Sequence, residues 1–339
     1  MYSVLYNNDL NKSNEEIVVI NTLKLINNYL RRLPIALSGL ALAIVSLAGA
    51  WDTFIGAGGG VQLIGSVIAS CLLILLLIKY VFHLELLNRD LAHVIAGSVA
   101  PTYTMALMLV ANNISLYAFK VGEIICFLAI LLHVYFLVCF IVYRIKDFKL
   151  IEVLPSWFIP PIGLVLAVIT HPGGLPPTLA SLLIYVAFIS YAILLPLVLY
   201  RLFFMGSLSN GEKPLFVILA APPSLVLISY LYWVEQANYL MVWGLVMLAI
   251  MMTFFVYLRL IKLVKLPFTP AFSAFTFPVV ISAIALFKTS TFLSNQGFPT
   301  PFVSFSSYLA VFELVIATCI IVYVAFRYAV YFWPVHHQQ

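Results

Sequence analysis

LPFTPAFSAFTFPVVISAIALFK, residues 266–288, has the length and apolar character of a membrane-spanning helix together with residues that interrupt one. Pro278 stands in its middle, where a proline removes a backbone hydrogen bond and kinks the helix. Phe277 directly precedes this proline, and hydroxyl side chains recur along the stretch at Ser273, Thr276 and Ser282. The pattern predicts a broken helix that lines a solvent path, with a bulky aromatic plug.

The composition of the whole chain is that of a helical membrane protein. Of 339 residues, 64% are hydrophobic and 9% are charged, against about 45–50% apolar and about 25% charged in soluble domains. The apolar residues form long runs, unlike the short alternating segments of an outer-membrane barrel. All four cysteines lie inside these runs without metal or redox spacing.

Motifs of catalysis are missing from the sequence. It contains no Gly-rich phosphate loop, no nucleophile with an adjacent base and no pair of catalytic carboxylates. We therefore expect an integral membrane protein that is not an enzyme, with no cofactor, no metal and no nucleic-acid partner.

Ten apolar segments are long enough to cross the bilayer, which takes about 20 helical residues. They are 34–52, 61–82, 93–112, 122–143, 154–170, 178–204, 214–234, 238–260, 270–288 and 302–331. The sequence WFIPPIG interrupts the fifth segment. We predict an all-α membrane domain over 34–331, built as five helical hairpins around a central pore.

The two ends of the chain are predicted to be cytoplasmic segments, 1–33 and 332–339. Residues 1–14 lack the basic start and apolar core of a signal peptide. Apolar residues then recur at helical spacing over 15–32, which favours an interfacial amphipathic helix. A frayed tail is the alternative for this segment.

Basic residues test the ten-span topology, because cytoplasmic loops carry an excess of Lys and Arg. All but two of the 17 basic residues fall on one side, and Lys120 and Lys288 are the exceptions. The other side instead has Gly- and Pro-rich loops at 56–60, 170–177 and 297–301. Both termini are therefore predicted on the cytoplasmic side of a cell membrane, and a single added or lost span would scramble this division.

Prolines and small residues distinguish odd-numbered from even-numbered spans. The odd-numbered spans contain Pro101, Pro160 with Pro161, Pro222 with Pro223, and Pro278. Small and hydroxyl residues accompany them, and we name Ser38, Ser98, Thr102, Pro160, Ser224, Ser273, Thr276 and Pro278 as candidates to line a pore. Broken helices are tolerated in membranes where protein or water satisfies the freed carbonyls, so the odd-numbered helices should be inner. Small residues that only allow close helix packing are the alternative.

No acidic or basic residue lies in the interior of the predicted inner spans, although Asp52 and Lys288 stand at span ends. Because coupled carriers usually place an ionisable residue on their pathway, this neutrality favours passive conduction. Selectivity for anions would come from hydroxyls, free backbone N–H groups and cations at the pore mouths. Glu123, His133 and Glu313 lie on even-numbered spans and are candidates for proton coupling or for an interface, with helix packing favoured for His133.

Several stretches resemble the tellurite-resistance/dicarboxylate transporter family, which includes TehA-like proteins and the plant guard-cell slow anion channels. The main match is LPFTPAFSAFTFPVV at the ninth span. Looser matches are LPIALSGLALAI (33–44), AHVIAGSVAPTYTMALMLVA (92–111) and KPLFVILAAPPSLVLISY (213–230). The resemblance covers residues 31–331.

The resemblance implies a ten-helix bundle with a pore in each protomer, assembled as a homotrimer. It also implies that Phe277 blocks the pore and faces the small residue Gly39 of the first helix. Where relatives carry paired aromatics, this chain has Phe272, Ser273 and Phe275, which could move the gate to Phe275. An ordinary core or lipid-facing side chain is the alternative for Phe277.

Three functions remain open at this point. The first is an anion channel occluded by an aromatic residue, and the second is a proton-coupled carrier of malate, sulfite or tellurite-related oxyanions. The third is a membrane-embedded enzyme or assembly factor, which the absence of clustered His, Cys or carboxylates disfavours.

Overall fold

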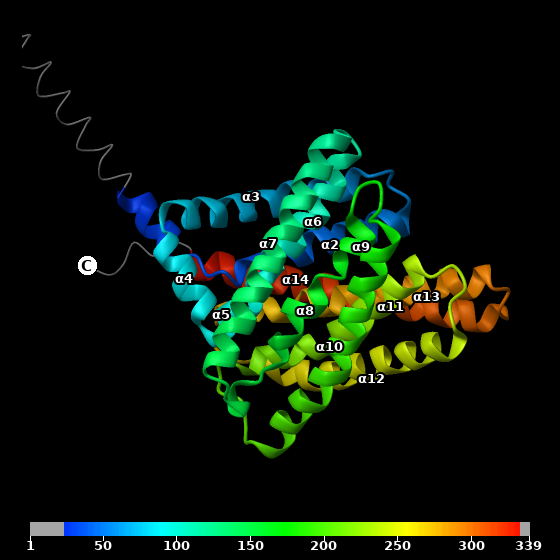
Figure 1. Cartoon of the computed structure of the whole chain (residues 1–339). Helices are drawn as coiled ribbons and strands as arrows, with labels where there is room; N and C mark the ends of the chain where they lie inside the picture. The colour runs from blue at the N-terminus through cyan, green and yellow to red at the C-terminus, as the bar shows by residue number, and fades with distance from the viewer. Residues whose placement is uncertain (1–23, 333–339) are drawn as a thin grey trace, which may run out of the picture.

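The computed structural model describes residues 24–332, and all regular secondary structure in this range is helical (Figure 1). The long helices are α2 (Leu37–Ile55), α3 (Gly60–Phe82), α7 (Phe119–Lys146), α10 (Pro177–Phe204), α12 (Tyr239–Leu263), α13 (Phe277–Asn295) and α14 (Thr300–Phe332). The shorter α-helices are α4 (Leu84–Ala92), α5 (Val94–Val99), α6 (Pro101–Ser115), α8 (Ile159–Gly163), α9 (Leu166–Thr170) and α11 (Ala221–Trp233). Four 3-10 helices complete the set: η1 (Leu150–Glu152), η2 (Pro155–Phe158), η3 (Lys213–Ala220) and η4 (Pro270–Phe275).

The predicted interfacial helix is described only in its second half. Residues 24–32 are helical and mostly exposed. Its first half and the C-terminal segment 333–339 lie outside the described residues.

Nine segments of the described chain are long and apolar enough to cross a membrane, one fewer than predicted. They are α2, α3, α5 with α6, α7, α10, η3 with α11, α12, η4 with α13, and α14. The predicted fifth span, 154–170, instead folds as the short helices η2, α8 and α9. Pro160 and Pro161 remove two backbone donors there and Gly163 lowers helix propensity, so one continuous helix is disfavoured.

Several helices run past the predicted ends of their spans. Helix α13 continues to Asn295, beyond Lys288, the predicted last residue of the ninth span. Residues 288–295 contain no glycine or proline, so nothing in them interrupts the helix. The first glycine after them, Gly297, adopts a positive φ of 69°. This glycine ends the helical region because it takes up the left-handed conformation at little cost.

The nine segments fall into two groups by burial. In the apolar stretches of α2, α5–α6, η3–α11 and η4–α13, 61%, 72%, 78% and 78% of the residues are buried. In those of α3, α7, α10, α12 and α14, between 28% and 39% of the residues are buried. Four apolar segments are thus enclosed by protein, whereas five carry apolar faces outward, which suits contact with lipid.

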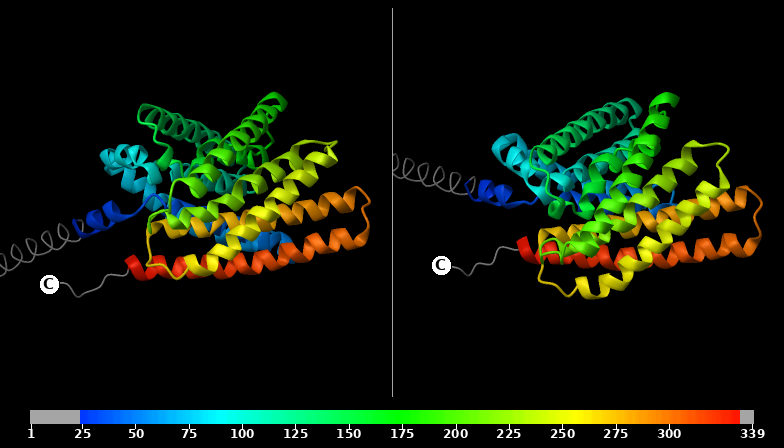
Figure 2. Two further views of the ribbon diagram at one scale, coloured as in Figure 1. Left: turned by 90° about the horizontal axis from the view of Figure 1, so that it is seen from below. Right: turned by 60° about the horizontal axis from the view of Figure 1, so that its bottom comes forward.

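Helices that follow one another in the chain pack side by side. This holds for α2 with α3, for α6 with α7 and for α13 with α14. Figure 2 shows α13 and α14, in orange and red, running alongside each other in both views. Each of these pairs joins one buried segment to one exposed helix.

Three buried segments pass from a 3-10 helix into an α-helix at a proline. The transitions are η2 to α8 at Pro160, η3 to α11 at Pro222 and η4 to α13 at Pro278. Proline suits the first turn of a helix, where no N–H donor is needed, and it removes the donor that would continue the α-helix toward its N-terminus. These prolines therefore fix where each regular helix begins and leave irregular backbone in the protein interior.

Candidate functional site

A cavity of about 440 Å³ lies where the buried segments meet. Its walls come from α2, α5, α6, α8, η3, α11, η4 and α13. Most of this lining is apolar, and its polar side chains include Thr102 and Ser273. The charged lining residues belong to the end of the cavity near α3 and α4, and they are Arg31, Arg32, Lys79, Arg89 and Asp90. The cavity is thus neutral along the inner helices and mainly basic at that end.

Phe277 and Gly39 both line this cavity. Phe277 is the first residue of α13 and 7% of it is exposed. Gly39, on α2, is closest to Ser273, because a Cβ built on it would lie 3.3 Å from Ser273 Oγ. The Thr276 hydroxyl approaches the Gly39 carbonyl at 3.4 Å. The two predicted gate residues therefore share one cavity, and η4 supplies the side chain nearest to Gly39.

Phe275, the alternative gate, lies in a different environment. It is fully buried and its ring centroid is 4.7 Å from that of Phe272. Phe272 in turn packs on Phe268, 5.3 Å away, and under the Arg327 guanidinium. Phe275 is not among the residues that line the cavity. Its position favours an aromatic packing role over a gate.

The predicted lining residues divide between the cavity and the packing around it. Thr102, Ser273 and Pro278 line the cavity together with Phe277 and Gly39. The others are buried beside it, namely Ser38, Ser98, Pro160, Ser224 and Thr276.

The hydroxyls outside the cavity are held by hydrogen bonds. Ser38 pairs with Thr102 across α2 and α6, with 2.6 Å between the hydroxyl oxygens. Ser224 donates to the Ala220 carbonyl at 3.0 Å, and Thr276 donates to the Ser273 carbonyl at 2.6 Å. Buried polar groups need such partners, so these hydroxyls contribute to helix packing and to the 3-10 turns.

His133 connects α7 to the broken segment that follows α7. Its Nε2 lies 2.9 Å from the Pro160 carbonyl, and its Nδ1 lies 2.7 Å from the Thr104 hydroxyl. A neutral imidazole satisfies both contacts when Nε2–H donates to Pro160 and Nδ1 accepts from Thr104. Since His133 is fully buried and outside the cavity lining, its geometry favours a structural role.

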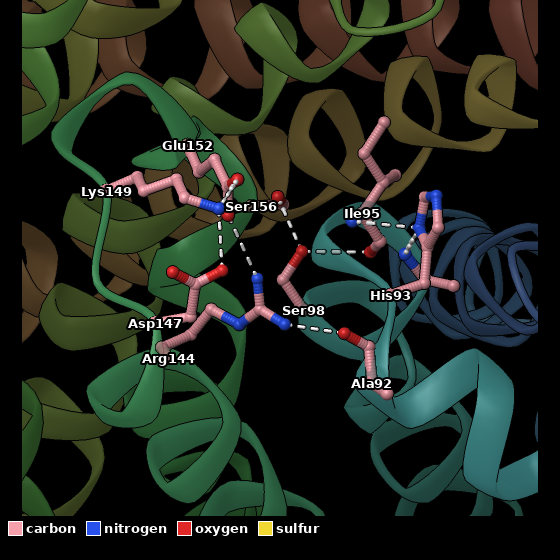
Figure 3. Close-up of polar contacts among 10 residues, drawn as sticks. Ala92, His93, Ile95, Ser98, Arg144, Asp147, Lys149, Glu152 and Ser156 are labelled. Carbon is pink, nitrogen blue, oxygen red and sulfur yellow. Dashed lines mark hydrogen bonds and ion pairs between the residues drawn. The ribbon is translucent and has the colours of Figure 1, made fainter.

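A polar network joins α4, α5, α7 and η1 next to the cavity (Figure 3). Arg144 donates to the Ala92 carbonyl at 2.5 Å and pairs with Glu152 at 3.3 Å. His93, which lines the cavity, caps α5 by accepting from the amides of residues 95 and 96 at 3.2 and 3.3 Å. The network fixes the start of α5 and therefore the cavity wall that α5 forms.

Figure 3 also shows two further contacts, of which Lys149 with Asp147 is exposed and Ser98 with Ser156 is buried. The Asp147 carboxylate accepts a 2.6 Å hydrogen bond from Lys149 and raises the pKa of that amine. Deeper in the protein, Ser98 on α5 donates to Ser156 on η2 at 2.7 Å. The Ser98 hydroxyl therefore ties two of the buried segments together.

Lys79 contributes a buried cation beside the cavity. Only 2% of the residue is exposed, and its ammonium lies 3.1 Å from Asp90 and donates to the Leu33 carbonyl at 2.8 Å. The Tyr80 hydroxyl also donates to Asp90, at 2.9 Å. This cluster links α3 and α4 to the chain that enters α2.

Cations at the pore mouths were predicted from the sequence, but the basic residues that line this end of the cavity were not named. Lys79 and Arg89 are ordinary positive-inside residues by position, because both lie near span ends. In a sequence, a basic residue near a span end looks the same whether it only orients the protein in the membrane or also lines a cavity mouth. The structure distinguishes the two roles because it shows which basic residues line the cavity.

Neither glutamate candidate reaches the cavity lining. Glu123, near the start of α7, pairs with Lys120 at 2.8 Å on the surface. Glu313, in α14, is 4% exposed and lies 2.5 Å from the Ser282 hydroxyl.

Comparison with known proteins decides the family. The family described as SLAC1, voltage-dependent anion channel, matches residues 32–329. The chain belongs to the SLAC1 family. A relative of the SLAC1-family chain is an uncharacterized transporter of Methanocaldococcus jannaschii, 25% identical over 237 residues that cover 61% of this chain and 68% of the relative.

This membership confirms the family predicted from the sequence. SLAC1-family proteins are channels and transporters and not enzymes, so family membership gives this protein an anion channel or transporter function. The apolar helices of the described chain make it a multi-pass membrane protein.

Proposed function

We propose that this SLAC1-family protein conducts small anions passively through the large cavity, with Phe277 as the gate. The observation that carries the proposal is that Phe277, Gly39 and Pro278 line one cavity formed by the buried segments. An aromatic ring on the first turn of a helix is positioned largely by the backbone, and here Pro278 restricts that backbone. Moving α13 or turning the ring would then open the path.

The charge distribution supports anions as the permeating ions. Lining residues on the inner helices are neutral, whereas Arg32 and Arg89 lie at the basic end. Cations at a pore mouth raise the local concentration of anions. A neutral interior then lets anions leave as readily as they bind, as conduction requires.

We extend this proposal to the architecture. The segment 154–170 would be the fifth of ten crossings, and the odd-numbered members of five hairpins would surround the pore. The two burial classes of helices support this arrangement. The exposed apolar faces of α3, α7, α10, α12 and α14 would face lipid or, in a homotrimer, neighbouring protomers, with both termini in the cytoplasm.

A proton-coupled carrier of dicarboxylates, sulfite or tellurite-related oxyanions is the second candidate. One observation favours it, since Glu313 is a buried carboxyl group within a membrane-spanning helix. Intramembrane carboxyl groups often serve proton relays. Glu313 lies outside the large cavity, however, so the channel remains our first proposal.

The deciding experiment measures conductance in reconstituted liposomes for the wild type, Phe277→Ala and Phe312→Ala. Phe312 lies on α14 with 59% exposure, so its variant controls for the loss of a phenyl ring outside the cavity. We expect Phe277→Ala to raise anion current about tenfold, which corresponds to removing a preference of about 1.4 kcal/mol for the closed state.

Two results would contradict the channel proposal. Equal currents in Phe277→Ala and Phe312→Ala would show that Phe277 is not the gate. Uptake that strictly requires a proton gradient would establish the carrier instead.

A further inference from the structure

A second, much smaller cavity lies between α11, α12, α13 and α14. It shares no lining residue with the large cavity. Its volume is about 10 Å³, close to the 10–15 Å³ or so that one water molecule needs. Glu313 lines it together with the hydroxyl residues Thr253, Ser282 and Thr289. A carboxyl group and three hydroxyls thus converge on space for a single water.

The Ser282 hydroxyl has more acceptors than protons. Its oxygen lies 2.5 Å from Glu313 Oε2 and 3.0 Å from the Val279 carbonyl oxygen. A serine hydroxyl has one proton to donate. When Glu313 is protonated, its O–H donates to Ser282 and Ser282 donates to Val279; when Glu313 is ionised, Ser282 must turn its proton to the carboxylate. The pair therefore has two hydrogen-bond arrangements that differ by one proton.

Two hydroxyls on α12 stand near this pair without a partner in the described chain. They belong to Thr253 and Tyr257, which are one turn apart and so share a helix face. Thr253 is 2% exposed and lines the small cavity. The Tyr257 hydroxyl meets no hydrogen-bond geometry in the described chain, but it lies close enough to Ser282 and Glu313 to interact with both. Buried hydroxyls are rarely left unpaired, so these two point to a bound water or to a charge that they can solvate.

No basic side chain pairs with Glu313 among the described residues. Of the elements packed against it, α12 presents the titratable Tyr257, α13 presents Ser282 and Thr289, and α11 presents Leu227. Helix α2 presents Leu47 and Ala50 beside Leu314. A carboxylate without a countercharge is costly at this depth, so the protonated form is favoured at rest.

We propose that Glu313 is a proton-binding site, served by one water in the small cavity and by the hydroxyls of Ser282, Thr253 and Tyr257. On release, the Glu313 O–H bond breaks and the proton leaves to bulk water. The three hydroxyls then turn to donate to the carboxylate, either directly or through the bound water.

One element, α13, belongs both to this site and to the gate, and the following step rests on the proposed function. Ser282 and Phe277 lie on the same helix, with Phe277 at its start. When Ser282 turns toward the carboxylate, it releases the Val279 carbonyl in the first turns of α13. Proton binding at Glu313 therefore favours one position of α13 over another and biases the opening of the pore.

Infrared difference spectroscopy of the purified full chain tests the proton site without any current measurement. Samples titrated in H₂O and D₂O reveal the C=O stretch of a protonated carboxyl group. Besides the bands of the other carboxyl groups, we expect one wild-type band that disappears as pH rises, that is absent in Glu313→Gln and that persists in Glu123→Gln. Gln has the shape of the protonated side chain, and monodispersity of that variant shows that it is folded.

Either of two results would overturn the proton site. One is a set of titrating bands in the folded Glu313→Gln variant identical to that of the wild type, because Glu313 would then contribute no titrating carboxyl group. A wild-type band that responds to Na⁺ at constant pH would assign the cavity to a metal cation instead.

Conductance then tests the connection to the gate separately. We expect wild-type current to change at least about threefold across the pH range of the infrared transition, with Glu313→Gln holding the low-pH value throughout. Glu123→Gln should follow the wild type. A Glu313 infrared transition with identical pH profiles in the wild type and Glu313→Gln would overturn the coupling, whereas absent anion current in all variants would reject the proposed function and leave the proton site standing.

Discussion

Gly39 illustrates how closely the inner helices approach one another. A Cβ at this position would lie 3.3 Å from Ser273 Oγ and 3.4 Å from Ser273 Cβ. These separations are tighter than most van der Waals contacts, so a β-branched side chain would push η4 away from α2. Since η4 leads directly into Phe277, the displacement would reach the proposed gate.

We expect Gly39→Val to reduce stability by about 1–3 kcal/mol, the usual cost of overpacking, and to alter anion conductance. Gly49→Val on the same helix is the control, because nothing lies within 4 Å of a Cβ there. The measurements are thermal unfolding in detergent and current in liposomes. Equal effects of the two variants would refute the close approach, whereas recovery in Gly39→Val/Ser273→Gly would support it.

His133 gives a second prediction for a single residue. Truncation in His133→Ala leaves the buried Pro160 carbonyl without its side-chain donor, whereas Thr104 keeps its hydrogen bond to the Pro101 carbonyl. An unsatisfied buried polar group costs about 1–3 kcal/mol, so we expect a marked fall in melting temperature with conductance per folded protein unchanged. A normal melting temperature together with lost proton dependence of transport would assign His133 a coupling role instead.

At the scale of helices and their connections, a proline can affect both the stability of the fold and the position where a helix begins, and Pro278 allows these two effects to be measured separately. Pro278 occupies the first turn of α13, where proline costs no hydrogen bond. Replacing a compatible proline costs about 0.4–1 kcal/mol through the entropy of the unfolded chain. Pro278→Ala should therefore be only mildly destabilising while it lets the α-helix extend back into η4.

Such an extension would turn Phe277 away from its present direction, so we expect Pro278→Ala to change anion current more than Pro196→Ala does. Pro196 lies inside α10, an exposed helix outside the cavity lining. Currents of the two variants, normalised to reconstituted protein, provide the comparison. Unchanged current in Pro278→Ala would mean that the proline does not determine where the ring points.

Long apolar runs made most helices predictable from the sequence, because length and hydropathy are properties of one segment at a time. The segment 154–170 shows the limit of this approach. Its composition fits a span, yet Pro160, Pro161 and Gly163 divide it into short helices. Hydropathy measures how apolar a segment is and does not show where prolines remove the backbone hydrogen bonds of a continuous helix.

The residues of the candidate site were also only partly predictable from the sequence. Phe277 and Gly39 line one cavity, whereas Ser38 turns its hydroxyl to Thr102. The pore-blocking role of Phe277 stays a prediction. Which face of a buried helix meets a cavity depends on all of its neighbours, and a single sequence does not contain that information. The pairing of Glu313 with Ser282 across two helices was hidden for the same reason.

Across the whole molecule, the number of membrane crossings fixes where the termini lie. Nine crossings place them on opposite sides of the membrane, whereas a tenth, through η2, α8 and α9, returns both to one side. The burial of 154–170 fits an inner, broken crossing, and the distribution of Lys and Arg favours an even number.

The segments that flank 154–170 decide between nine and ten crossings. Phe148 and Pro176 are exposed on either side of it. In a background where the four native cysteines are replaced by alanine, we expect Phe148→Cys to react with a membrane-impermeant maleimide only after the cells are opened. Pro176→Cys should react in intact cells, since an odd number of crossings would separate the two positions. If both cysteines react from the same side, 154–170 does not cross, and the remaining nine spans place the termini on opposite faces.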